Sequence, residues 1–292
     1  MIERVGIVAK TRLTGAGAHL AEIASWLQAR GVAPVFEIET AALAGLEGSP
    51  RSATRDELPL LVDLVLVLGG DGTLLGMADR IARSGRDIPI LGVNFGGLGF
   101  LTEITFPELY PSLESMLAGT AHTDERLMLR ATVRRGGDVF AERVVLNDVV
   151  FSRGVLSRMI DLSVSVGGQF VARFNADGLI ISSPTGSTAY NLSAAGPIVH
   201  PEVDALVLTP IAPHILTNRP VVIPASAEVW VQPATHDQQQ HVFLTFDGQT
   251  GFELQADDVV TVRRAEQKAR LVRASTRSYF EVLREKLKWA ER

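Results

Sequence analysis

The stretch LVLVLGGDGTLLGMA, residues 64–78, constrains the fold of this chain more than any other. An apolar run of Leu and Val meets two glycines, and apolar residues at helical spacing follow within a few positions. A buried strand that turns through glycines into a helix is the repeating unit of a parallel α/β sheet. The open question is why a carboxylate, Asp71, lies between the glycines.

The first 120 residues repeat this strand–helix unit. Because strands that alternate with short helices form parallel sheets, we expect helices on both faces and a ligand at the carboxyl ends of the strands. The predicted strands cover 4–9, 33–39, 63–69 and 88–96, and the predicted helices cover 15–31, 73–85 and 106–119.

The pattern changes near Glu125. Short runs with a period of two residues, separated by glycine turns, predict an all-β segment with hairpins at 136–138 and 167–168. The same pattern of period-two runs and turns continues over 227–233, 241–255 and 258–264. A single helix is predicted inside it, over 187–197, and another over 275–289 that packs back on the first part. We therefore expect two domains, residues 1–125 together with 270–292, and residues 126–269.

Composition limits the partners. Of the 292 residues 46% are hydrophobic and 21% charged, as in globular proteins, and the net charge of −5 gives no basic surface for nucleic acid. The sequence has no cysteine, no secretory h-region and no apolar run near the ~18 residues of a membrane helix. The six histidines show no ligand spacing, so no protein-made metal site is predicted. We expect a cytoplasmic protein without a membrane or nucleic-acid partner.

Two glycine-rich turns follow predicted strands, GGDGT at 69–73 and NFGGLGFLTE at 94–103. Glycines let the backbone approach a ligand closely, and the N–H groups of a following helix hold phosphate oxygens. The alternative to a ligand site at GGDGT is an ordinary turn with Asp71 as a helix cap. The alternative at NFGGLGFLTE is a turn that only connects two elements. Neither turn is a P-loop, because no glycine loop contains a lysine, and neither has the strict dinucleotide fingerprint.

Two further stretches carry polar groups in apolar surroundings. Asn147 and Asp148 lie inside the run LNDVVF, where they need partners or a ligand unless they mark an edge or bulge. Residues 175–197, NADGLIISSPTGSTAYNLSAAGP, bring many hydroxyl groups to a predicted helix start. A plain hydroxyl cap is the alternative there.

Taken in order, these four stretches resemble the ATP-dependent NAD kinase family over nearly the whole chain. The GGDGT loop also occurs in other kinases, whereas DGLIISSPTGSTAYNLSAAGP is specific to this family. The resemblance implies an N-terminal Rossmann-like α/β nucleotide-binding domain, a β-sandwich domain that binds the dinucleotide, and a C-terminal helix that returns to the first. It also implies a homodimer or homotetramer.

The resemblance also assigns residues. Asp71 corresponds to the base that faces the 2′-hydroxyl of the adenosine ribose of NAD, and Asp148 replaces a more usual Glu. Asn175 stands where relatives carry an arginine or another residue linked to donor or cofactor preference. The implied binding residues are Gly70, Gly72, Asn147, Asp148, Arg158, Asn175, Asp177, Thr188, Ala189, Tyr190, Asn191, Leu192, Ser193 and Gln249.

The implied reaction transfers the terminal phosphoryl group of ATP, with Mg²⁺ or another divalent metal, to NAD and gives NADP. Phosphoryl transfer has a loose transition state, so Asp71 would mainly orient the 2′-oxygen and accept its proton late. Polyphosphate as donor and NADH as acceptor stay open. Two other functions stay open as well, a lipid or sugar-phosphate kinase that shares the GGDGT loop and a dinucleotide sensor without catalysis.

Overall fold

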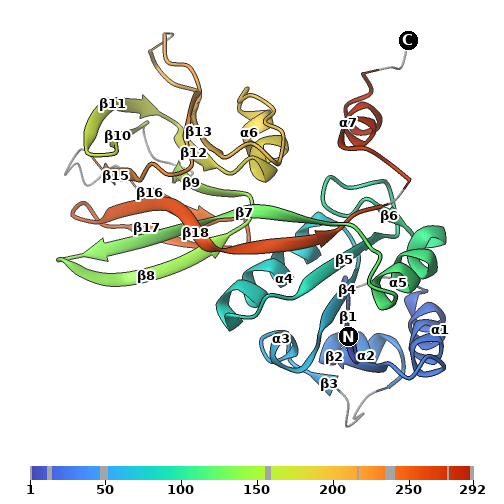
Figure 1. Ribbon diagram of the computed structural model, residues 1–292. Coiled ribbons are helices and arrows are strands. Elements are labelled where there is room, and N and C mark those ends of the chain that lie inside the picture. Colours follow the sequence, from blue (N-terminus) through green and yellow to red (C-terminus); the bar gives the residue numbers. More distant parts are fainter. Residues whose placement is uncertain are drawn as a thin grey trace. The chain divides into compact units, whose positions relative to one another are not determined.

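The computed structural model describes residues 2–11, 15–46, 52–154, 159–215, 217–233, 241–274 and 276–289 (Figure 1). By contacts the chain divides into two compact units, residues 1–125 with 269–292 and residues 126–268. Each unit has its own arrangement of strands and is described by itself.

The first unit contains a parallel sheet in the order β5-β4-β1-β2-β3. Two more segments, β6 and the end of β18, pair with β5 in parallel. Because strand order reverses between β1 and β4, their carboxyl ends form the switch point at which such sheets bind ligands. The strands are β1 (Arg4–Ala9), β2 (Ala33–Glu37), β3 (Ser52–Ala53), β4 (Leu64–Leu68), β5 (Pro89–Asn94) and β6 (Ile104–Thr105).

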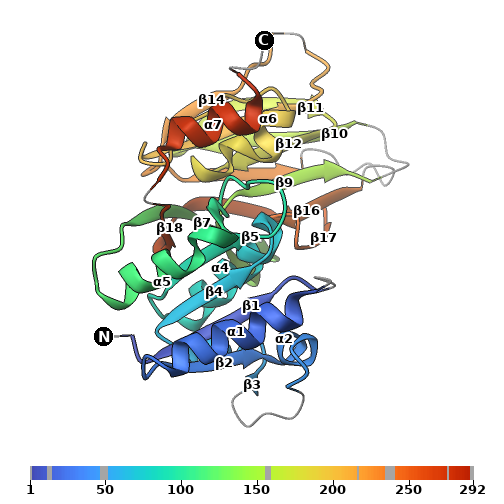
Figure 2. The same cartoon turned by 90° about the vertical axis from the view of Figure 1, so that its right-hand side faces the viewer.

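Helices cover both faces of this sheet. Figure 1 shows α1 and α5 on one side of the strands and α3 and α4 on the other, and Figure 2 turns α1 and α5 toward the viewer. Ile7 of β1 packs in the cluster shared with α1 and α5, whereas its neighbour Gly6 faces Leu58 of α3. The helices are α1 (Ala16–Gln28), α2 (Ile38–Leu43), α3 (Leu58–Leu61), α4 (Asp71–Ser84), a 3-10 turn (Phe106–Glu108), α5 (Leu109–Leu117) and α7 (Tyr279–Leu287).

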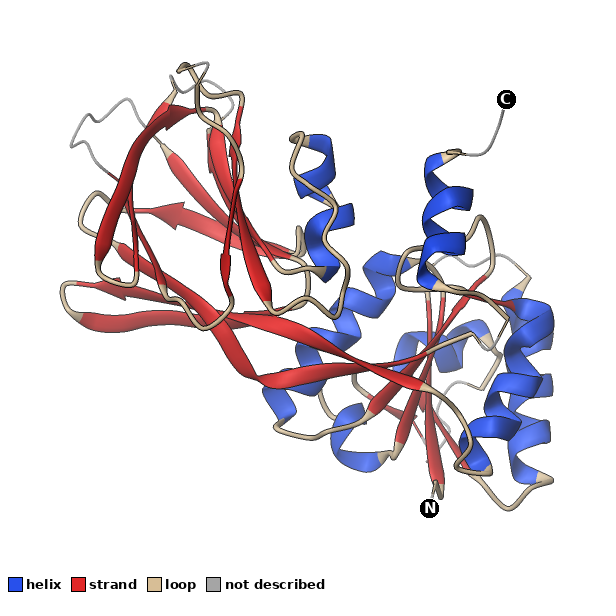
Figure 3. Ribbon diagram, turned by 45° about the horizontal axis from the view of Figure 1, so that its top comes forward, coloured by secondary structure: helices blue, strands red, loops and turns tan. Residues whose placement is uncertain are grey.

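The second unit is antiparallel. One sheet has the order β14-β13-β12-β9-β16-β17. The other strands form β11-β10-β15-β18, with β7 paired to β18 and β8 paired to β7. Figure 3 shows these strands in red. Their bounds are β7 (Thr123–Arg135), β8 (Asp138–Val145), β9 (Asp148–Arg153), β10 (Ile160–Val166), β11 (Gln169–Ala176), β12 (Gly178–Ser182), β13 (Ala205–Ile211), β14 (Val221–Pro224), β15 (Val229–Pro233), β16 (Val242–Phe246), β17 (Thr250–Leu254) and β18 (Val259–Val272).

Apolar side chains from both sheets of this unit form one core, as in a β-sandwich. Phe151 of β9 and Leu162 of β10 are fully buried in it. Each such side chain stabilises the fold by about 1.5–3 kcal/mol relative to an exposed one. The predicted fold class, an α/β domain followed by an antiparallel β domain and a C-terminal helix, is confirmed.

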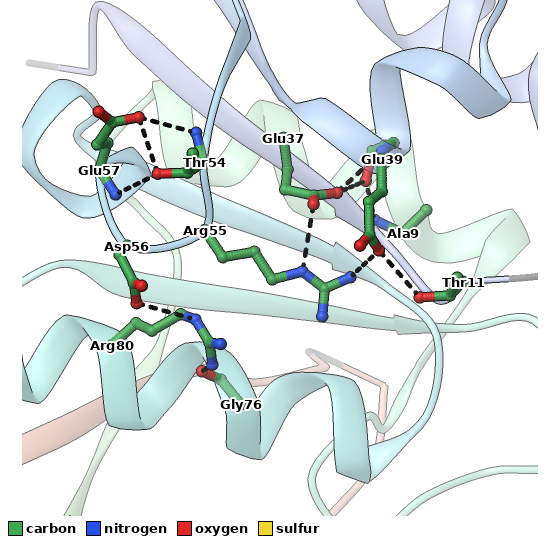
Figure 4. A network of polar contacts seen from close by, with 11 residues as sticks. Ala9, Thr11, Glu37, Glu39, Thr54, Arg55, Asp56, Glu57, Gly76 and Arg80 are labelled. Atoms are coloured by element: carbon green, nitrogen blue, oxygen red, sulfur yellow. Dashed lines mark hydrogen bonds and ion pairs between the residues drawn. The ribbon is translucent and has the colours of Figure 1, made fainter.

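One predicted strand end and one predicted helix are wrong. The strand expected over 33–39 ends at Glu37, because the Glu37 carboxylate accepts the Thr40 N–H at 2.9 Å and starts α2. This buried carboxylate also pairs with Arg55, with Nε and Oε1 3.4 Å apart (Figure 4). The helix expected over 187–197 is a 3-10 turn (Thr185–Thr188) followed by the short α6 (Tyr190–Ser193). Within the described residues, no helix is long and apolar enough to cross a membrane.

Candidate active site

Asp71 is the first residue of α4 and is held by a turn 30 residues further along the chain. Its Oδ2 accepts the Phe100 N–H at 3.0 Å, and its Oδ1 accepts the N–H groups of Leu101 and Thr102 at 3.1 and 3.0 Å. The Thr102 hydroxyl also donates to Oδ1, at 2.9 Å. The carboxylate is not a helix cap, because Gly70 is the N-cap of α4 and no side chain makes a cap bond there. It joins the two glycine-rich turns of the sequence.

The close approach of these turns depends on Gly99. A Cβ atom there would overlap Oδ1 of Asp71 and Oγ1 of Thr102 and would lie 3.0 Å from Cγ of Asp71. Gly97, two residues earlier, has nothing within 4 Å of such an atom. The glycine-rich pattern predicts a turn here, but no local signal in the sequence distinguishes Gly99 or Thr102 from their neighbours.

Lys10 lies at the switch point, directly after β1. Its N–H donates to the carbonyl of Leu68, the last residue of β4, at 2.8 Å. A Cβ atom on Gly69 would lie 3.1 Å from Cβ of Lys10, so the lysine side chain leaves the backbone beside the GGDGT turn. Among the described residues no carboxylate forms an ion pair with Lys10. Lys10 is not among the site residues predicted from the sequence, because it lies in neither glycine-rich turn.

In the second unit, Asp148 is the first residue of β9, and Asn147 lies in the turn from β8 directly before it, so the pair stands at the end of a strand and not in its interior. Asp247 holds this turn. Its Oδ2 accepts the Leu146 N–H at 2.9 Å, and its Oδ1 accepts those of Asn147 and Asp148 at 2.7 and 3.0 Å. Asp247 adopts φ 51°, a left-handed conformation that is uncommon for a residue other than glycine.

Burial gives this turn unusual electrostatics. Asp148 is 4% exposed, and burial together with the charge of Asp247 raises the pKa of its carboxyl group to about 7. Oδ1 of Asn147 is buried and has no hydrogen-bond partner among the described residues. Because buried polar atoms are normally paired, this oxygen is suited to accept an N–H group from a ligand.

The hydroxyl-rich segment after β12 packs against the same turn. The Ser183 N–H donates to the Asn147 carbonyl at 2.9 Å, and a Cβ atom on Gly186 would overlap that carbonyl. Two hydroxyl groups here bond within the segment, Ser187 to the Pro184 carbonyl at 2.6 Å and Thr188 to the Thr185 carbonyl at 3.3 Å. Asn191 is fully buried, and its amide contacts the Ser187 carbonyl and the Thr209 hydroxyl.

The predicted residue Asp177 does not lie at this turn. Asp177 precedes β12 and pairs with Arg153, with Oδ1 and Nε 2.7 Å apart, whereas Asp148 is opposite Ser182 at the other end of β12. The two aspartates are therefore five residues apart along β12, a distance of about 17 Å at the usual rise of a strand.

Two more predicted residues lie at different places in this unit. Asn175 is two residues before Asp177 and donates to Asp161 at 2.9 Å. Gln249 is exposed in the turn after β16, close to Asp247 in the chain. Tyr190 of α6 is 47% exposed. Arg158 lies outside the described residues. In the part of the chain that the structure describes, no group of three or more His, Asp or Glu side chains is arranged to hold a metal.

Comparison with known proteins identifies the chain. Residues 5–121 match the model of the ATP-NAD kinase N-terminal domain, and residues 146–274 match that of the ATP-NAD kinase C-terminal domain. NAD kinases of Geobacter sulfurreducens and Geobacter metallireducens are 49% and 48% identical over 291 residues, which is the whole of this chain and of each relative. The NAD kinase of Solibacter usitatus is 44% identical and is covered to 99%.

Two solved structures are similar in fold. A yeast NADH kinase in complex with NADH has a TM-score of 0.89 and 25% identity, over 100% of this chain and 89% of that one. An NAD kinase from Archaeoglobus fulgidus in complex with ATP has a TM-score of 0.75 and 25% identity, over 97% and 99%. The fold and these relatives define a phosphotransferase. The chain belongs to the ATP-NAD kinase family, which confirms the resemblance drawn from its motifs.

Proposed function

We propose that the chain transfers the terminal phosphoryl group of ATP to the 2′-hydroxyl of the adenosine ribose of NAD, giving NADP, with Asp71 as general base. The first unit would bind the donor nucleotide and the second the dinucleotide. The observation that carries the role of Asp71 is its place at the carboxyl end of β4, held by four hydrogen bonds.

The two oxygens of Asp71 differ in capacity. A carboxylate offers about four lone-pair sites, and Oδ1 already accepts three hydrogen bonds whereas Oδ2 accepts one. Oδ2 is therefore the oxygen with room for the ribose hydroxyl. As the 2′-oxygen bonds to the terminal phosphorus and the bond to the leaving ADP breaks, the hydroxyl proton passes to Oδ2.

The charge of the donor requires cations. Lys10 supports the proposal, because it starts beside Gly69 at the switch point and forms no ion pair among the described residues. We assign its ammonium group to the donor phosphates, together with N–H groups of the glycine turns.

A divalent metal fits this site only through the donor. Because the described side chains form no cage of three or more metal-binding groups, Mg²⁺ would be held by the phosphates and by water. When bound, it supplies neutralisation of phosphate charge.

The dinucleotide needs acceptors for its amide or amino groups. The unpartnered Oδ1 of Asn147 and the neighbouring Asp148 support this part of the proposal. The roles of Arg158, Asn175, Asp177, Gln249 and residues 188–193 stay predictions, as do the cytoplasmic compartment and the homodimer or homotetramer.

The proposal is tested with the purified protein, Mg²⁺ and a matrix of donors and acceptors. We expect NADP to form from NAD and ATP, and we expect an NAD analogue with a 2′-deoxyadenosine ribose to give no phosphorylated product. Polyphosphate and NADH as alternative substrates decide donor and cofactor preference. Phosphorylation of the deoxy analogue, or of a lipid or sugar phosphate in place of NAD, would overturn the assignment.

A further inference from the structure

A chain of side-chain hydrogen bonds leads to Asp71 from the end of β5. Nδ2 of Asn94, the last residue of that strand, donates to Oγ1 of Thr102 at 3.1 Å. The Thr102 hydroxyl in turn lies 2.9 Å from Oδ1 of Asp71. Thr102 is fully buried, so its hydroxyl has no access to bulk water.

The direction of this chain is fixed by a backbone group. The Gly96 N–H donates to Oδ1 of Asn94 at 2.7 Å, and an N–H group only donates. The Asn94 amide is therefore oriented with its nitrogen toward Thr102. Because Asn94 uses a lone pair of the Thr102 oxygen, the hydroxyl hydrogen is left to point at Asp71.

This orientation distinguishes the two carboxylate oxygens. Rotation about the last side-chain bond of an aspartate has a broad, roughly two-fold profile, so an unanchored carboxylate interchanges them. The N–H groups of Phe100, Leu101 and Thr102 anchor the carboxylate to the turn. The Thr102 hydroxyl adds the third bond to Oδ1 and so completes its coordination.

We propose that Asn94 and Thr102 are positioning residues for the reaction, which orient Asp71 so that its Oδ2 faces the ribose hydroxyl. The inference rests on the proposed role of Asp71 as the base. Neither residue needs to touch a substrate, and both act through the carboxylate. Removal of either therefore lowers kcat and leaves the KM for NAD nearly unchanged, because binding groups stay in place.

Three variants test the chain of bonds. Thr102→Val keeps the size of the side chain but removes the hydroxyl, and we expect kcat to fall about ten- to hundredfold, the range for one charge-assisted hydrogen bond. Thr102→Ser keeps the hydroxyl and restores most of the activity. Asn94→Asp still accepts from Gly96 but offers no donor to Thr102, whose hydroxyl then turns toward residue 94, so it behaves like Thr102→Val.

A matched control lies directly before α3. The Thr54 hydroxyl donates to Oε2 of Glu57 at 2.8 Å, in the same kind of bond but outside both glycine-rich turns. Thr54→Val loses an equivalent hydroxyl–carboxylate contact, so it lowers the melting temperature without changing kcat. A fall in the kcat of Thr54→Val as large as that of Thr102→Val would show that both changes act through general loosening and would overturn the proposal.

A double-mutant cycle separates positioning from a structural role. In the background of Asp71→Asn, Thr102→Val has nothing left to orient, so it causes no further loss of kcat. An additional loss equal to that in the parent protein would contradict positioning, as would an unchanged kcat in the single variant. Near-normal turnover of Asp71→Asn alone would instead refute the base, so the two failures are distinguishable.

Discussion

Gly99→Ala tests how closely the two glycine-rich turns must meet. The added methyl group would overlap Oδ1 of Asp71 and Oγ1 of Thr102, and neither partner is the far end of a flexible chain, because each lies in a hydrogen-bonded turn. The carboxylate has to retreat by on the order of 1 Å to reach ordinary van der Waals contact. A misplacement of that size lowers turnover by about 100-fold, equivalent to about 2.7 kcal/mol in activation free energy.

The assay is steady-state NADP formation, with Gly97→Ala as the control. Gly97 belongs to the same turn, its Cβ position is open, and its φ is not left-handed, so the substitution removes the same backbone freedom without the overlap. We expect Gly97→Ala to keep a kcat within about threefold of the parent protein. A Gly99→Ala variant that is equally active would refute the claim that the turn and the carboxylate are held in contact for catalysis.

Three further predictions concern single charges. Burial and the charge of Asp247 raise the pKa of Asp148 from 3.8 to about 7, so the folded state binds this proton more tightly than the unfolded state does. The free energy of unfolding is therefore highest below about pH 4 and falls by about 4 kcal/mol as the pH rises past 7. Denaturant unfolding of Asp148→Asn across this range should lack that loss, and a parallel curve would contradict the raised pKa. Asp247→Asn keeps a residue type that tolerates left-handed φ but loses charge-assisted bonds to three N–H groups, so the free energy of unfolding should fall by about 3 kcal/mol. An unchanged value would mean that water replaces those bonds. Lys10→Met should raise the KM for ATP about tenfold while Lys268→Met, an exposed lysine of the second unit, does not, and equal effects would remove Lys10 from the donor site.

The fold could be predicted because its signals are local. The run of Leu and Val in β4, the glycines after it and the helical spacing of α4 all lie within 21 residues, and α4 ends at Gly85, whose φ of 70° closes the helix. The change to period-two patterning after Glu125 likewise marks the antiparallel strands directly. Such patterns indicate which face of a helix or strand is buried, and the apolar faces predicted in this way lie in the two hydrophobic cores of the structure.

The site could be predicted only in part, because its partners are distant in sequence. Asp71 was recognised from its turn, but its hydrogen bonds to residues 100–102 span about 30 positions, and those of Asp247 to residues 146–148 span about 100. No periodicity connects such residues. The sequence shows that a carboxylate is present, and the fold alone decides which N–H groups meet it.

The failed helix over 187–197 has a local cause that patterning does not capture. The Asn191 side chain bonds to the carbonyls of Ser187 and Pro197, and so competes with the backbone bonds of a continuous helix. Ala189 accordingly leaves helical geometry, with φ −94° and ψ −130°. The Ser187 and Thr188 hydroxyl groups donate to carbonyls within this irregular segment and help to hold it together.

The most direct measurement of the account is the turnover of Asp71→Asn with saturating NAD, ATP and Mg²⁺, alongside the affinity of the same variant for NAD. The amide preserves the shape of the side chain but accepts no proton at this pH. We predict a kcat lower by roughly two to four decades, the usual contribution of a general base, with NAD binding largely intact. Turnover close to that of the parent protein would contradict the assignment of Asp71 as the base.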